Sequence, residues 1–121
     1  MALVRDVVSA LHQIAPVHMA YANDRVGLQV GLPDHPVTRG VVAFDPSLAA
    51  IAHCANVGAQ MLVTHHPLIW APLTGLGPDG HASERAFEAA RKGVAVAVAH
   101  TNWDAAPNGL NDLLAKRLGL S

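Results

Sequence analysis

Residues 59–67, Ala-Gln-Met-Leu-Val-Thr-His-His-Pro, place two adjacent histidines directly after an apolar run. The run predicts a buried β-strand over residues 60–64. Pro67 cannot donate to a strand ladder and keeps residue 66 out of the helical region, so we expect the chain to bend there. Both imidazoles therefore lie where a strand ends.

A second apolar run ends in the same way. Residues 94–99 predict another buried strand, and the sequence His-Thr-Asn-Trp-Asp follows at 100–104. A third run, residues 38–44, predicts a strand that is followed by Asp45. Three predicted strands thus end in side chains that can bind a metal ion or move a proton.

Helices are predicted between and around these strands. The first helix runs from Leu3 to about Ala15, and residues 26–31 form a short strand after a loop. Asp45 is predicted to cap a helix that starts with Pro46 and runs to about Asn56, with Gly58 placed to end it. Ser83 is predicted to cap a helix that reaches Lys92. The last helix spans about residues 108–118, with leucines 110, 113, 114 and 118 on one face.

This order of elements predicts an α/β fold with a mainly parallel sheet flanked by helices. The strands are continuously apolar, which is typical of parallel sheets that are covered on both faces. Right-handed crossovers place the carboxyl ends of parallel strands at one edge, where such sheets bind ligands. We therefore expect a metal site at that edge, among the residues Asp45, His65, His66, His100 and Asp104.

The gathered residue types suit Zn, Mn, Fe or a similar divalent ion. A bent pair of adjacent histidines can reach two ions about 3.5–4 Å apart, and Asp104 can bridge them. His100 either binds an ion or holds a ligand in orientation through a hydrogen bond. Asp45 is either a helix cap or a residue of the site. Without a metal, the histidines would be satisfied by backbone and water.

The composition of the chain argues against some classes of binding partner. The formal net charge of −1 gives no general attraction to nucleic acid or to an anionic membrane. No stretch approaches the roughly 20 apolar residues of a membrane span, and residues 1–6 do not resemble a signal peptide, so we expect a cytoplasmic protein. The lone Cys54 excludes multi-cysteine zinc sites and fits a small buried apolar residue.

Four ordered motifs carry a family resemblance. They are Val-Gly-Leu-Gln-Val-Gly at 26–31, Thr-His-His-Pro-Leu-Ile at 64–69, His-Thr-Asn-Trp-Asp-Ala-Ala at 100–106 and Gly-Leu-Asn-Asp at 109–112. Together they resemble the NGG-interacting-factor-three-like family, whose members are often called GTP cyclohydrolase type 2 homologues. The resemblance spans nearly the whole chain.

The resemblance implies an α/β fold with a dinuclear metal centre, assembly into a toroidal hexamer, and hydrolysis by metal-activated water. His65, His66 and Asp104 match metal ligands of the family. Family members continue into a second half that supplies a further His and Glu. Residues 1–121 are therefore expected to form one α/β domain equivalent to the first half. The family's usual Trp-Asp-Asn is Asn23-Asp24-Arg25 here.

His65, His66 and Asp104 provide too few ligands for two ions. Two four-coordinate ions need about eight metal–ligand contacts, or fewer where one group bridges both ions. The chain is therefore expected to bind metal weakly, to hold one ion, or to borrow ligands from a partner chain. Two functions follow as hypotheses. One is a metal-dependent hydrolase, or its amino-terminal half, acting on a small-molecule nucleotide or phosphoester. The other is a binding or scaffold module that works through a homo-oligomer or a missing second half, with apolar surface exposed where that partner packs.

Overall fold

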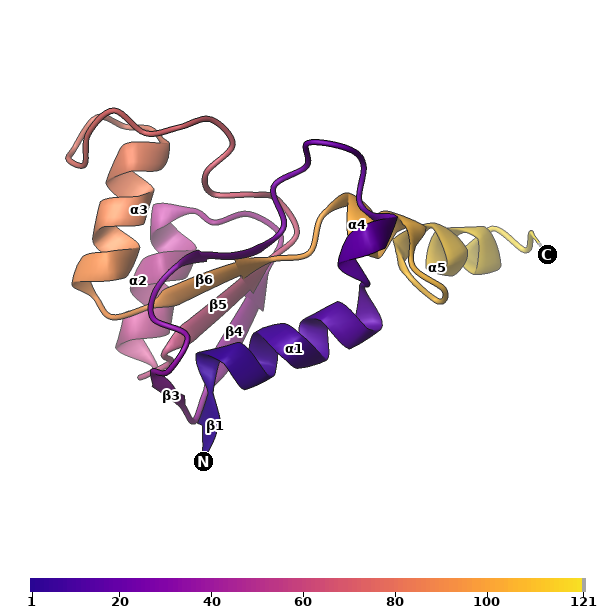
Figure 1. Cartoon of the computed structure of the whole chain (residues 1–121), viewed down its shortest axis with the longest axis horizontal. Coiled ribbons are helices and arrows are strands. Elements are labelled where there is room, and N and C mark those ends of the chain that lie inside the picture. The colour runs from indigo at the N-terminus through magenta and orange to yellow at the C-terminus, as the bar shows by residue number, and fades with distance from the viewer. Residues whose placement is uncertain (121) are drawn as a thin grey trace.

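A four-stranded sheet lies at the centre of the computed structural model, which describes residues 1–120 (Figure 1). The elements in chain order are β1 (Ala2–Leu3), α1 (Val4–Ile14), the 3₁₀ turn η1 (Val17–Met19), β2 (Gly27–Val30), β3 (Pro36–Val37), β4 (Gly40–Ala43), α2 (Leu48–Asn56), β5 (Met61–Thr64), α3 (Ala82–Arg91), β6 (Ala95–Val98), α4 (Thr101–Ala105) and α5 (Leu110–Arg117).

The sheet has the order β2-β6-β5-β4, and strands β4, β5 and β6 run parallel. This confirms the predicted α/β fold with a mainly parallel sheet. Strand β2 pairs with β6 in the antiparallel sense, so the sheet is mixed. Strands β1 and β3 form a separate two-stranded ribbon. The antiparallel β2 matters below, because its first residues lie beside the end of β6.

Helices cover the two faces of the sheet through alternating strand residues. Leu62 and Val96 pack with Ile51 of α2 and Ala89 of α3 on one face. On the other face, Val4 of α1 packs with a second set of strand residues, which are Met61, Ala95 and Ala97. Figure 1 shows α2 and α3 together on one side and α1 crossing the other. The core is therefore built of aliphatic side chains on both sides of β5 and β6.

Strand β4 departs from the expectation that all parallel strands are covered on both faces. Val42 is 82% exposed, and Phe44, just after the strand, is 60% exposed. Helix α1 packs over residues of β5 and β6 and leaves this edge strand open on its side. The alternating exposure of β4 follows, although its sequence is uniformly apolar.

Two predicted helix caps are wrong. Ser47, not Asp45, caps α2, because its Oγ accepts a hydrogen bond from Ala50 N at 3.0 Å. Helix α3 begins before Ser83, and the carboxylate of Asp79 accepts from the backbone N–H groups of His81 and Glu84. The predicted caps are engaged elsewhere: Asp45 contacts His66, and Ser83 holds the loop that precedes α3.

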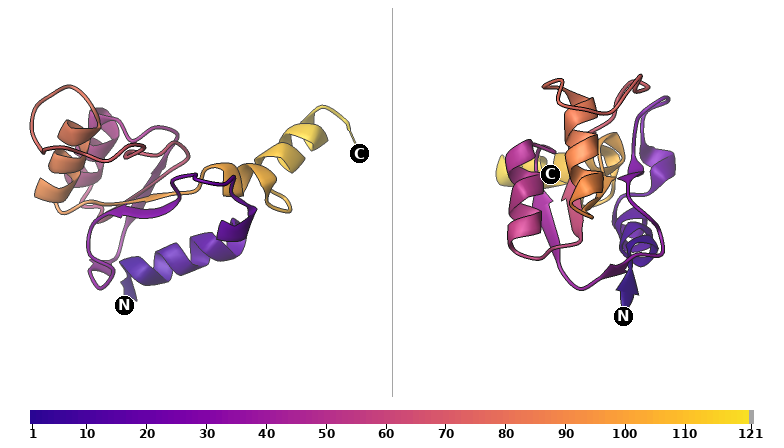
Figure 2. Two further views of the ribbon diagram at one scale, coloured as in Figure 1. Left: turned by 45° about the horizontal axis from the view of Figure 1, so that its top comes forward. Right: turned by 90° about the vertical axis from the view of Figure 1, so that its left-hand side faces the viewer.

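Helix α5 confirms the predicted last helix and projects away from the sheet (Figure 2). Its leucines are exposed, with relative exposures from 39% at Leu110 to 66% at Leu118. Among residues 1–120, no helix is both long and apolar enough to cross a membrane.

Candidate metal centre

Three histidines from two neighbouring strand ends meet at the carboxyl edge of the sheet. Thr64, the last residue of β5, pairs with Val98, the last residue of β6. His65 and His66 therefore leave the sheet beside the segment that carries His100. One ring nitrogen from each of the three histidines lies within 4.8 Å of the others. The predicted convergence of the two motifs on one edge is thus present in the structure.

Hydrogen bonds from two side chains hold the bend that lets the adjacent histidines face one site. Thr64 Oγ1 donates to His66 O at 2.8 Å and curls the chain back at the end of β5. Gln29 of β2 then fixes the segment after Pro67, since its Oε1 accepts from the N–H groups of Leu68 and Ile69 at 2.8 and 2.9 Å. The predicted strand break is confirmed, but Thr64 and Gln29 enforce it together with Pro67.

Each of the three imidazoles is held in one tautomer by an acceptor at Nδ1. His65 Nδ1 lies 2.9 Å from Ala99 O, and His66 Nδ1 lies 2.6 Å from Asp45 Oδ1. His100 Nδ1 lies 2.9 Å from Asp24 Oδ1. A carbonyl or carboxylate oxygen only accepts, so each Nδ1 carries the hydrogen. In the neutral imidazole, Nε2 then carries the free lone pair, which is the form of histidine that binds metals.

Asp104, on α4, completes the donor set. Its Oδ1 lies 3.5 Å from His65 Nε2, is buried, and accepts no hydrogen bond from any residue among 1–120. A buried carboxylate oxygen without a partner is costly, and this one lies beside His65 Nε2, which carries a lone pair when the ring is neutral. A cation between the two atoms removes the conflict. Ligands of a tetrahedral zinc ion also stand about 3.4 Å apart, given bonds of about 2.0–2.1 Å. The residues present therefore fit a divalent ion.

Asp24 anchors the third histidine and was not predicted. Its carboxylate is 2% exposed and accepts from His100 Nδ1, from Thr101 N at 3.1 Å, from Thr101 Oγ1 and from Arg25 N at 2.7 Å. Burial alone would raise the pKa of Asp24, but the hydrogen bonds outweigh it and lower the pKa to about 2. Asp24 is thus a carboxylate throughout the physiological pH range.

The depressed pKa of Asp24 predicts an acid-sensitive contribution to folding. A carboxyl group with an ordinary pKa of 3.8 and a folded pKa of about 2 stabilises the fold by about 2 kcal/mol above pH 4. That contribution disappears as pH falls from 4 through 2. In urea unfolding of the metal-free protein, the gap between wild type and Asp24→Asn should close over this interval. A gap of constant size would show that Asp24 ionisation does not stabilise the fold.

Asn102 ties the His100 segment to the first helix. It is fully buried, its Oδ1 accepts from His100 N at 2.8 Å, and its Nδ2 donates to Ala15 O at 2.8 Å.

Trp103 lines an apolar groove of about 470 Å³ that lies between α1 and the open edge of the sheet and reaches His65. Phe44 shares that groove, and its ring centroid lies 4.5 Å from that of His66.

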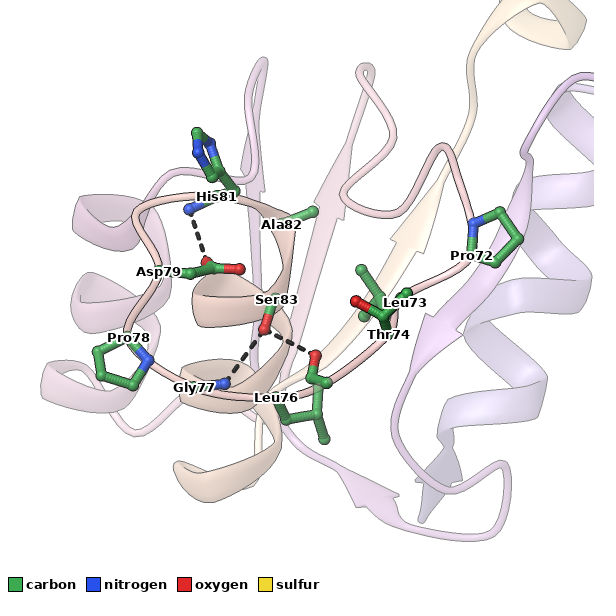
Figure 3. Close-up of a pocket in the computed structure, with 11 residues that line it drawn as sticks. Pro72, Leu73, Thr74, Leu76, Gly77, Pro78, Asp79, His81, Ala82 and Ser83 are labelled. Carbon is green, nitrogen blue, oxygen red and sulfur yellow. Dashed lines mark hydrogen bonds between the residues drawn. The ribbon is translucent and has the colours of Figure 1, made fainter.

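A second hollow, of about 450 Å³, lies in the loop of residues 72–83 and shares no lining residue with the histidine cluster. Figure 3 shows Ser83 Oγ hydrogen-bonded within this loop, where it donates to Gly75 O and accepts from Gly77 N. Asp79 is likewise engaged by His81 N. The polar groups of this hollow hold the loop in shape, so it offers no set of free metal donors.

The chain resembles known proteins over nearly its full length. A sequence model of the family Duf34/NIF3 (NGG1p interacting factor 3) matches residues 2–121. The chain is 35% identical over 116 residues to the "GTP cyclohydrolase 1 type 2 homolog" of Streptomyces coelicolor, covering 96% of this chain and 41% of that protein. It is 32% identical to the protein of the same name from Lactococcus lactis, covering 98% and 46%.

Among solved structures, the chain is similar to the Bacillus cereus protein related to NIF3, with a TM-score of 0.91 and 32% sequence identity. That alignment covers 100% of this chain and 34% of the other. The chain spans less than half the length of these relatives, and it matches them over its own full length.

Proposed function

The chain belongs to the Duf34/NIF3 (NGG1p interacting factor 3) family, and we propose that it binds a divalent metal ion and serves as a metal-dependent hydrolase or as the amino-terminal half of one. One observation carries the proposal. Three imidazoles, each with its Nδ1 hydrogen engaged, converge on one another, and His65 Nε2 lies 3.5 Å from Asp104 Oδ1, which has no hydrogen-bond partner among residues 1–120. His65, His66 and Asp104 are the proposed ligands.

The protein's own groups prepare this site in definite ways. Ala99 O and Asp45 orient His65 and His66 through their Nδ1 hydrogens and keep each Nε2 free. Asp104 supplies negative charge that a cation would neutralise. When bound, a divalent ion acts as a Lewis acid and makes water more acidic. The groove beside His65, with Phe44 and Trp103 in its lining, offers an apolar surface for a substrate.

The name of the relatives points to opening of the guanine ring of GTP, and a phosphoester is the second substrate class that suits such a site. The test incubates the metal-loaded chain with GTP and with a panel of phosphoesters, alongside chelator-treated protein and His65→Ala. We expect turnover of one substrate class in the loaded wild type alone. Equal turnover in all three samples, or none at all, contradicts hydrolysis by this site.

The second proposed function is association with a further copy of the chain. It rests on the exposure of Val42, Phe44 and Ile14 around the groove and of the leucines on α5. Sedimentation velocity should show an oligomer at micromolar concentration, and Val42→Lys should lower its fraction. A monomer over the whole concentration range contradicts this function and leaves metal binding unaffected.

A further inference from the structure

We propose that His100 is a third imidazole ligand and that Asp24 positions it, so that this chain alone carries the donors for a single metal ion. The inference rests on the metal binding proposed above and adds two residues to it. The ligands proposed above are His65, His66 and Asp104, and they include neither His100 nor Asp24.

The fold brings Asp24 to His100 across 76 residues of sequence. Asp24 precedes β2, and β2 pairs antiparallel with β6, so the first residues of β2 lie beside the end of β6: Gly27 pairs with Val98. The chain reaches His100 two residues after Val98. Thr101 closes the arrangement, because its N–H and Oγ1 donate to Asp24 while its Oγ1 accepts from Tyr21 N at 2.9 Å.

The chemistry of this contact selects the metal-binding form of His100. A carboxylate offers only acceptors, so the hydrogen of the neutral imidazole must sit on Nδ1 and the lone pair on Nε2. A buried carboxylate at this position also raises the basicity of the ring and holds its orientation. The side chain of Asp24 is 2% exposed, so water does not compete for the contact. Asp45 acts on His66 in the same way, with a more exposed carboxylate.

His100 changes the ligand count. His65, His66 and Asp104 leave a tetrahedral ion one protein ligand short, and the third imidazole fills that position. The three histidines already have ring nitrogens within 4.8 Å of one another, and Asp104 Oδ1 lies 3.5 Å from His65 Nε2. One ion held by all four donors requires side-chain movement, because Asp104 lies outside the group formed by the three imidazoles. The predicted shortage of ligands therefore holds for two ions and not for one.

The test uses the full chain with ¹⁵N-labelled histidine, first without metal. Imidazole nitrogen shifts should report hydrogen on Nδ1 of His100 in the wild type and a shift toward Nε2 in Asp24→Asn, whose amide can donate. Zinc affinity, measured by competition with a chelating dye, should fall by about 10–100-fold in Asp24→Asn. Asp34→Asn, the same change at an exposed carboxylate, should alter neither reading.

Two further variants separate the possible outcomes. If His65→Gln loses zinc and His100→Gln retains wild-type affinity, metal binding stands and the role of His100 is overturned. If the wild type takes up no zinc, both proposals fall. If Asp24→Asn lowers stability but leaves the His100 tautomer and zinc affinity unchanged, Asp24 has only a structural role. Where Asp24→Asn does not fold, hydrogen on Nε2 of His100 in the wild type still overturns the inference, and hydrogen on Nδ1 supports it.

Discussion

Replacing Asp104 with alanine should lower the affinity for a divalent ion by at least about 100-fold while leaving the metal-free chain as stable as the wild type or about 1 kcal/mol more stable. The two effects have one cause. Asp104 Oδ1 is buried without a hydrogen-bond partner among residues 1–120, so the metal-free fold bears its desolvation cost and gains no contact in return. A bound cation would give that oxygen a partner.

Urea unfolding of metal-stripped protein and a zinc competition titration measure the two effects separately. Asp104→Asn is the matched variant, because it keeps the size of the side chain and removes the charge. Asp112→Ala on α5 controls for loss of a carboxylate away from the cluster in the zinc titration, and its stability reading includes the lost hydrogen bond from Asn108 N. A clear loss of stability in metal-free Asp104→Ala, with unchanged zinc affinity, would mean that Asp104 is a structural turn residue.

Replacing Asn102 with alanine should destabilise the fold by about 3 kcal/mol, a large share of the roughly 5–15 kcal/mol typical of a domain. The side chain is fully buried and joins His100 N to Ala15 O. Its loss leaves a buried N–H and a buried carbonyl without partners, and removes the tie between α1 and the segment that carries His100 and Asp104.

Chemical denaturation of metal-free protein gives the size of this effect. Asn111→Ala, at an exposed position on α5, is the matched control and should change the free energy of unfolding by less than about 0.5 kcal/mol. A similarly small change at Asn102 would show that water replaces both hydrogen bonds and that the tie contributes little.

The sequence was sufficient to predict the location of the candidate site, because strand ends in a parallel sheet meet at one edge. The apolar runs before His65 and His100 marked two such ends, and β5 and β6 are adjacent and parallel. The ligand roles of His65, His66 and Asp104 stay predictions. The fold itself brings ring nitrogens of His65, His66 and His100 within 4.8 Å of one another and sets Asp104 Oδ1 3.5 Å from His65 Nε2.

Asp24 could not be predicted in the same way. It lies in a loop before β2, and its contact with His100 depends on the antiparallel pairing of β2 with β6. An apolar run such as 27–30 has no feature that fixes the direction of its pairing. Two indications were available: Asp24 keeps the middle residue of the family's usual Trp-Asp-Asn, and it lies shortly before a predicted strand.

The two misplaced caps have a related cause. Asp45 and Ser83 each precede or begin a helical pattern, and local propensity favours them as caps. Asp45 instead accepts the Nδ1 hydrogen of His66, and Ser83 bonds the loop at Gly75 and Gly77. In both cases a contact distant in sequence replaced the local one, and Ser47 and Asp79 took over the capping.

The exposure of one face of β4 could likewise not be predicted from its apolar sequence. Its residues are as apolar as those of β5, and a covered strand and an edge strand open on one face look the same in such a run. Only the path of α1 over β5 and β6 decides that Val42 stays exposed.

Metal content per chain decides between a metal centre and a vestigial cluster. The chain should be purified untagged and without chelators, dialysed against Zn or Mn, and measured by elemental mass spectrometry. Three converging imidazoles with Asp104 beside His65 predict close to one divalent ion per chain in the wild type, and far less in His65→Ala. No bound metal in the wild type after dialysis, or equal metal in the wild type and His65→Ala, would contradict metal binding by this cluster.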